Sequence, residues 1–158
     1  MSQHAFTAIG IVRSPFTQTA GTPIQPVGAE AVEGDVVLED TYAPGLKDIE
    51  GFSHLFLIYV FDRSRPGVLC LKPFLDDVER GVFATRAPCR PNPIGLSLVR
   101  LLRRDGNVLR IAGIDLLDGT PLLDIKPYIP QLNPKDDVRI GWLNGRTDGF
   151  TNARSGGR

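Results

Sequence analysis

The chain is poor in cysteine and histidine, with two of each among 158 residues. Two cysteines, Cys70 and Cys89, are too few for a disulfide framework, and they lack the spacing of paired metal ligands. With only His4 and His54 to add, a Cys/His zinc site would need ligands from distant parts of the fold. The composition therefore predicts no metal cofactor.

Long apolar runs and an amino-terminal export signal are also missing. The longest nearly apolar run, residues 54–61, is far shorter than the roughly 20 residues of a membrane-spanning helix. The amino terminus has no basic stretch followed by an apolar one. We therefore expect a soluble, cytoplasmic protein with no membrane segment.

Neither sign of charge is in excess, because 18 basic side chains balance 18 acidic ones, which argues against a general polyanion binder. The balance conceals a gradient, since residues 1–61 hold seven acids and two bases whereas residues 62–110 hold five acids and ten bases. From Arg80 to Arg110 there are seven arginines, no lysine and one acid, Asp105. Arginine suits planar, bidentate contact with phosphate or carboxylate. An anionic partner is therefore expected in the middle of the chain.

Short, evenly spaced segments rich in apolar and β-branched residues predict an all-β fold. The expected strands are residues 5–13, 34–39, 52–61, 80–85, 95–103, 107–114 and 122–128. They do not alternate with long helices, and Asp105-Gly106 is a hairpin signal between two of them. A helical turn is expected at 41–50 and a short helix at 136–144. We predict a small single-sheet β-barrel with one or two short helices.

The strand at residues 52–61 is apolar on both faces. Such a strand is buried on both sides or lies in a subunit contact. A small barrel has only one interior to fill, so the pattern favours a homodimer.

Familiar nucleotide-binding motifs are absent, since no GxGxxG follows an expected strand and there is no P-loop. The GxSxG nucleophile elbow of hydrolases is absent as well. Chemistry is therefore sought in three polar segments bracketed by Pro and Gly. In residues 85–97, Pro88, Pro91 and Pro93 stiffen a stretch that displays Arg and Asn, either as a ligand loop or as a rigid connection. Residues 115–128 hold three carboxylates around an Asp-Gly turn, and residues 22–28 form an ordinary loop or part of a site.

Together these segments resemble one family. The matching strings are residues 9–16 (IGIVRSPF), 51–55 (GFSHL), 81–86 (GVFATR), 90–97 (RPNPIGLS), 118–121 (DGTP) and 124–128 (DIKPY). They occur in the order found in the TsaA-like family of S-adenosylmethionine-dependent methyltransferases. The resemblance covers residues 5–131, expected to be the barrel domain, and leaves residues 132–158 as a short helix and flexible tail.

The resemblance implies a homodimeric barrel that binds S-adenosylmethionine in loops near the dimer interface. It also implies methylation of N6 of threonylcarbamoyladenosine at position 37 of tRNA, with the arginines contacting the anticodon loop. Carried over position by position, the donor contacts are Ile24, Gln25, Pro26, Asp62, Arg63, Arg86, Leu96, Leu117, Asp118, Gly119 and Thr120. Methyl transfer from a sulfonium needs no covalent catalyst, but a carboxylate that accepts the N–H proton would help. Asp118 is the candidate and Asp124 the second choice.

This chain departs from the family at Asp62 and Ala87, where members often have His and Ser. The tRNA-modifying members from bacteria usually continue into an additional C-terminal domain, whereas this sequence ends soon after the expected barrel. Two alternatives therefore stand beside tRNA methylation. One is a sensing barrel that binds the donor without turnover, and the other is a small-molecule methyltransferase.

Overall fold

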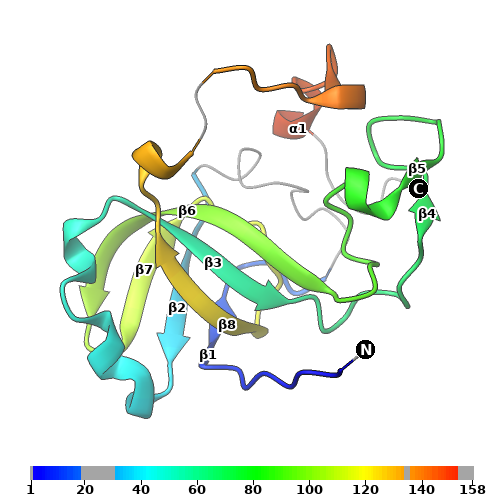
Figure 1. Ribbon diagram of the computed structural model, residues 1–158. Coiled ribbons are helices and arrows are strands. Elements are labelled where there is room, and N and C mark those ends of the chain that lie inside the picture. The colour runs from blue at the N-terminus through cyan, green and yellow to red at the C-terminus, as the bar shows by residue number, and fades with distance from the viewer. Residues whose placement is uncertain (1, 19–30, 134–135, 153–158) are drawn as a thin grey trace.

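The computed structural model describes residues 2–18, 31–133 and 136–152, and its centre is a β-barrel (Figure 1). The barrel strands are β1 (Gly10–Arg13), β2 (Glu33–Leu38), β3 (His54–Val60), β6 (Ile94–Asp105), β7 (Val108–Ala112) and β8 (Thr120–Pro127). Neighbouring strands follow the order β1-β2-β7-β6-β3-β8, every pair is antiparallel, and β1 pairs with both β2 and β8 to close the barrel. The predicted all-β, single-sheet barrel is confirmed.

The remaining elements are short. The 3₁₀ helices lie at Asp40–Leu46, Ile49–Gly51, Val82–Ala84, Pro130–Leu132 and Gly141–Leu143, and α1 is Gly149–Asn152. The first two occupy the stretch for which the sequence predicts a helical turn. Strands β4 (Cys70–Leu71) and β5 (Arg80–Gly81) form a separate two-stranded sheet. No helix within the described residues is long and apolar enough to span a membrane.

Three expected elements differ from the structure. The strand expected at 80–85 ends at Gly81, because its partner β4 is only two residues long and offers nothing further to pair with. The chain then turns into a 3₁₀ helix that buries Val82 and leaves Phe83 76% exposed. The first strand is Gly10–Arg13 rather than 5–13, and the helix expected at 136–144 is reduced to the single turn Gly141–Leu143.

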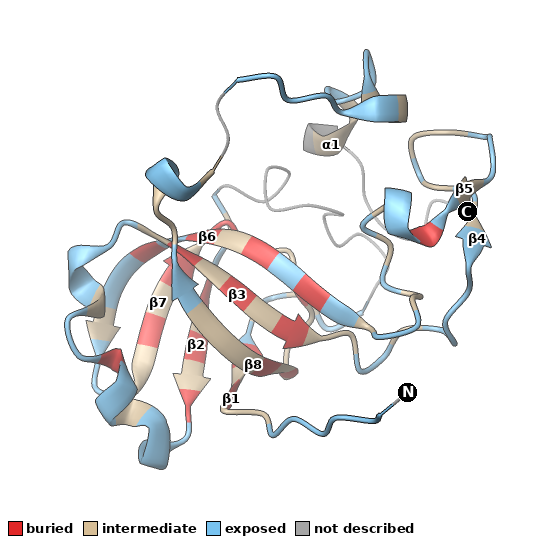
Figure 2. Cartoon of the chain, in the orientation of Figure 1, coloured by how far each residue is buried: buried red, intermediate tan, exposed pale blue. Residues whose placement is uncertain are grey.

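The barrel core follows the alternation of side chains along each strand (Figure 2). In β3, Leu55, Leu57 and Tyr59 point inward and are almost fully buried, while the residues between them are half-buried. In β6, Val99 and the polar Ser97 are buried on the same interior side. Burial of the apolar side chains stabilises the barrel by about 25 cal/mol per Å² of apolar surface removed from water.

A second layer of loops packs beside one end of the barrel and includes β4, β5 and α1 (Figure 1). Trp142 ties the carboxyl-terminal segment to this layer, because its Nε1 donates to Ala84 O at 2.8 Å. The Arg80 guanidinium lies 5.6 Å from the centroid of the Trp142 ring and forms a 2.6 Å ion pair with Asp76. The hydrogen bond from Arg80 lowers the pKa of Asp76. Helix α1 lies within residues 132–158, the stretch expected to hold a short helix and a flexible tail.

Gly95 is required by the packing of Tyr59. The two residues face each other across the β3–β6 pair, and a Cβ on Gly95 would lie 2.1 Å from Cε2 of the Tyr59 ring. That ring is 3% exposed and packs edge-on against Phe61 at 5.2 Å between centroids, so it has no room to withdraw.

We expect Gly95→Ala to lower the free energy of unfolding by about 1–3 kcal/mol, the usual cost of overpacking a filled core. Gly81→Ala is the matched control, because a Cβ there meets nothing within 4 Å and the backbone is extended. The control should be unchanged or slightly stabilised. Urea unfolding measures both, and equal stabilities for the two variants would contradict the assigned packing.

Candidate functional site

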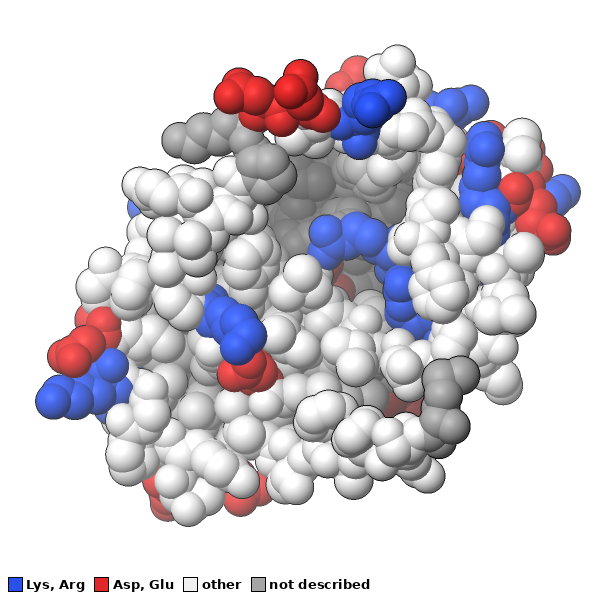
Figure 3. Space-filling model, viewed as in Figure 1, with Lys and Arg blue, Asp and Glu red and all other residues white. Residues whose placement is uncertain are grey.

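A cavity of about 1050 Å³ lies between the barrel and the second layer. From the barrel side it is lined by the end of β3, the start of β6 and the loop before β8. From the other side it is lined by residues 71–75 and 83–90, together with Trp142, Leu143 and Phe150. Figure 3 shows a deep hollow with basic side chains within it. The basic residues lining the cavity are Arg63, Arg65, Lys72, Arg86 and Arg90.

Most of the expected donor contacts meet at this cavity. Six of them line it, and they come from segments that are far apart in the sequence: Asp62, Arg63, Arg86, Leu96, Leu117 and Thr120. Asp118 and Gly119 belong to the turn between Leu117 and Thr120 but are not among the lining residues. Ile24, Gln25 and Pro26 lie outside the described residues.

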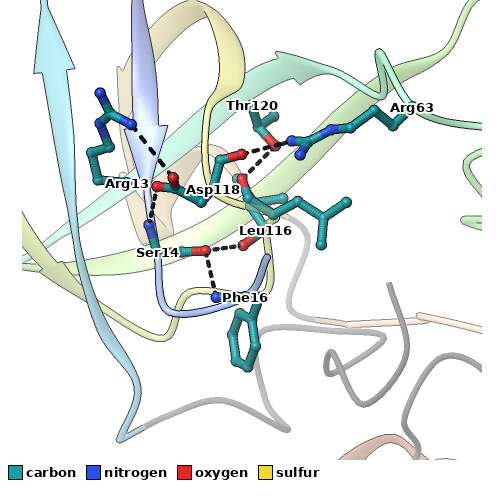
Figure 4. A network of polar contacts seen from close by, with 8 residues as sticks. Arg13, Ser14, Phe16, Arg63, Leu116, Asp118 and Thr120 are labelled. Atoms are coloured by element: carbon teal, nitrogen blue, oxygen red, sulfur yellow. Dashed lines mark hydrogen bonds and ion pairs between the residues drawn. The ribbon is translucent and has the colours of Figure 1, made fainter. Parts of the chain in front are cut away.

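The turn before β8 is held from one side by the residues that follow β1 (Figure 4). Ser14 donates its backbone N–H to Asp118 Oδ1 at 3.1 Å and its hydroxyl to Leu116 O at 2.5 Å. Arg13 Nη1 lies 3.4 Å from Asp118 Oδ2. The carboxylate of Asp118 is thus occupied by β1 and the residue after it.

From the cavity side, Arg63 completes the attachment of the turn. Its Nη2 donates to Asp118 O at 2.9 Å and to Thr120 Oγ1 at 3.3 Å, and Thr120 Oγ1 donates to Leu117 O at 2.7 Å. Gly119 adopts φ +78°, which favours glycine. A turn held by two strand ends presents its backbone at a defined position, as a preorganised ligand site requires.

The proline-rich loop is held by arginine side chains that bond to the backbone. Arg86 donates to Leu96 O, and Arg90 Nη1 donates to Thr85 O at 3.2 Å and Ala87 O at 3.3 Å. The cations of this loop therefore line the cavity while also fixing the shape of its wall.

The arginines between positions 80 and 110 do not form one patch. Arg80 pairs with Asp76, Arg104 with Glu50, and Arg110 with both Glu33 and Asp35. The hydrogen bonds that Arg110 donates to Asp35 and Glu33 raise the pKa of Arg110. Of these seven arginines, Arg86 and Arg90 line the cavity, whereas Arg104 on β6 and Arg110 on β7 form ion pairs on the barrel.

Three polar side chains at the barrel end of the cavity form a hydrogen-bonded row. Ser97 donates its hydroxyl to Asp115 Oδ1 at 2.8 Å, and Tyr59 Oη lies 3.0 Å from Ser97 Oγ. Burial raises the pKa of Asp115 to about 6, against an opposing effect of the Ser97 hydrogen bond. Burial also raises the pKa of Tyr59. In the sequence Asp115 is only one of three nearby carboxylates, and nothing there marks its partners.

We expect Asp115→Asn to become progressively more stable than the natural protein as pH rises from 4 to 7.5. A carboxyl whose folded pKa is raised stabilises the protein below its unfolded pKa and loses that contribution as pH rises through its folded pKa. The difference in unfolding free energy should grow by about 1–3 kcal/mol over this range. Urea unfolding at several pH values measures it, and a difference independent of pH would contradict the assigned environment of Asp115.

Two named relatives resemble the chain over most of its length. A protein of Pyrococcus abyssi named as a probable S-adenosyl-L-methionine-binding protein is 50% identical over 153 residues, which cover 97% of this chain and 83% of that protein. The tRNA (adenine(37)-N6)-methyltransferase of Escherichia coli is 40% identical over 140 residues, covering 82% of this chain and 60% of that enzyme.

A crystal structure of TrmO from Pseudomonas aeruginosa superposes with a TM-score of 0.75 at 38% identity, over 89% of this chain and 63% of that one. The chain thus spans under two thirds of the length of that protein and of the Escherichia coli enzyme. Residues 11–134 match the family described as the tRNA-methyltransferase O N-terminal domain, and the chain belongs to that family.

Proposed function

We propose that the cavity binds S-adenosylmethionine and that the protein transfers its methyl group to N6 of threonylcarbamoyladenosine at position 37 of tRNA, in the cytoplasm. The observation that carries this proposal is the convergence of Asp62, Arg63, Arg86, Leu96, Leu117 and Thr120 on one cavity. Relatives named for binding the donor and for methylating adenine 37 support it.

The cavity has the chemistry that such a donor requires. Its volume of about 1050 Å³ is at the upper end for small-molecule sites. Apolar side chains such as Phe61, Leu71 and Leu116 offer surface for a base, and the Arg63 and Arg86 guanidiniums offer partners for a carboxylate. The described residues contain no group of three or more His, Cys, Asp or Glu side chains placed to hold a metal ion.

In the proposed reaction the protein acts mainly by positioning. The donor supplies an activated methyl group on sulfur, and transfer is an in-line displacement that depends on alignment and on exclusion of water. The turn at residues 117–120, held by Ser14 and Arg63, and the loop stiffened by Arg86 and Arg90 form opposite rigid walls. Asp118 as proton acceptor stays a prediction, and its carboxylate contacts Arg13 and Ser14.

The substrate proposal rests on cations that the fold leaves available. Arg65 and Lys72 line the cavity, and neither forms an ion pair with any residue that the structure describes. In complexes with nucleic acids, Arg and Lys side chains commonly contact phosphate oxygens. Donor binding without turnover remains the competing proposal, because two relatives matched over 83% and 89% of their own length are named as binding proteins.

We expect calorimetry to show S-adenosylmethionine binding with a dissociation constant on the order of micromolar. Arg86→Ala should weaken donor binding by about 10- to 100-fold, because the variant loses a charged contact with the donor and the hydrogen bond from Arg86 to Leu96 O. Arg139→Ala is the control, since Arg139 is exposed and does not line the cavity. Absence of detectable heat near millimolar donor would refute the donor site.

A methylation assay with labelled donor tests the acceptor. We expect incorporation into tRNA that carries threonylcarbamoyladenosine and none into the same tRNA without that modification. Binding of the tRNA should weaken as salt rises, in proportion to the number of phosphates contacted. Donor binding without methyl transfer to either tRNA would favour the sensing barrel, and transfer to a small molecule alone would favour a small-molecule methyltransferase.

We propose a homodimer through the outer face of β3 and β6. Phe56 pairs with Leu98 and Ile58 pairs with Leu96 across this face, so an apolar stripe faces outward. Light scattering should give roughly twice the monomer mass of 17.3 kDa. Ile58→Glu should yield the monomer, and a natural protein that is monomeric at working concentration would contradict the proposal.

A further inference from the structure

Asp115 is the acidic side chain that the donor and acceptor assignments leave without a role. Within the described residues, two carboxylates line the cavity, Asp62 and Asp115. Asp62 lies 3.4 Å from the guanidinium of Arg63 and is partly exposed. Asp115 forms no ion pair with any described residue, and its carboxylate accepts hydrogen bonds from the Ser97 hydroxyl and from its own backbone N–H.

Burial of the ionised Asp115 carboxylate lowers the stability of the folded protein. A buried carboxylate loses hydration that neutral hydrogen-bond donors replace only in part. The neighbours in the row, Ser97 and Tyr59, are each buried and fixed by strand pairing, so they orient the carboxyl rigidly. A site that tolerates such a cost and holds the group at the edge of a ligand cavity has the properties of a proton acceptor.

We propose that Asp115 accepts the proton released by the acceptor nitrogen during methyl transfer, an inference that rests on the proposed function. As the nitrogen–carbon bond forms, the sulfur–carbon bond breaks and its electron pair stays on sulfur, which becomes a neutral thioether. The nitrogen loses its proton to Asp115, and the proton then passes to solvent. No further reactant is needed.

The geometry favours Asp115 over the two carboxylates chosen from the sequence. Asp118 is turned toward Arg13 and Ser14 and is not among the residues lining the cavity. Asp124 pairs with Lys126 at 2.8 Å and likewise does not line it. Asp115 alone of these three combines a place at the cavity with a carboxyl that carries no paired cation.

Three elements place polar or charged groups around Asp115. Tyr59 on β3 lies beyond Ser97 in the hydrogen-bonded row, Ser97 is on β6, and Arg86 in the proline-rich loop favours the ionised carboxylate. Tyr59 stays protonated at physiological pH because burial raises its pKa. The methylation rate should therefore fall with a single acid limb near pH 6.

The test measures donor affinity and single-turnover methylation rate separately, using the modified tRNA. Asp115→Asn should lower the rate by about 100-fold or more, the usual contribution of a general base, and should abolish the acid limb. Its donor affinity by calorimetry should stay within about threefold. Asp105→Asn is the matched control, because Asp105 is exposed at the β6–β7 turn.

Ser97→Ala separates a catalytic carboxylate from a structural one. Losing the hydroxyl removes a hydrogen bond that favours the ionised form, so the acid limb should move to higher pH while the rate at alkaline pH is largely retained. A folded Asp115→Asn variant that methylates at the rate of the natural protein would overturn this inference and leave the proposed function standing. An acid limb that stays at the same pH in Ser97→Ala would do the same. An inactive natural protein would overturn the proposed function and this inference with it.

Discussion

Closure of the barrel by β1 is the constraint on which the site depends. This strand is only four residues long, yet it pairs with β2 on one side and β8 on the other. Gly10 permits the approach, because a Cβ there would lie 2.3 Å from Val37 O. The closed register places Ser14 against the turn before β8, which is about a hundred residues away in the chain.

The closed barrel positions the walls of the cavity. The turn becomes a rigid wall because β1 holds it from outside and Arg63, at the end of β3, holds it from the cavity side. The β3–β6 pairing aligns Tyr59 with Gly95 and brings Ser97 to Asp115. Opposite, the second layer supplies Trp142 and the proline-rich loop. The barrel strands thus fix the positions of the side chains at one end of the cavity, and the loops provide most of the residues that line it.

The pattern of apolar residues was sufficient to predict the barrel, because alternation and spacing are local properties of each strand. It was insufficient at residues 80–85, where the absence of a long partner ends the strand. Clustering of arginines in sequence did not predict clustering in space, because Arg104 and Arg110 pair with acids on the barrel. The sequence does not distinguish Asp115 from Asp118 and Asp124, because its hydrogen-bond partner Ser97 lies 18 residues away and carries no local signal.

The central claim is that the cavity between the barrel and the second layer is the donor site. Amide chemical-shift mapping during titration with S-adenosylmethionine tests it most directly. We expect shifts at Arg63, Arg86 and residues 115–120, with the β6–β7 turn at Asp105 and Gly106 unaffected. Saturable shifts confined to surfaces away from the cavity, or no shifts at millimolar donor, would contradict it.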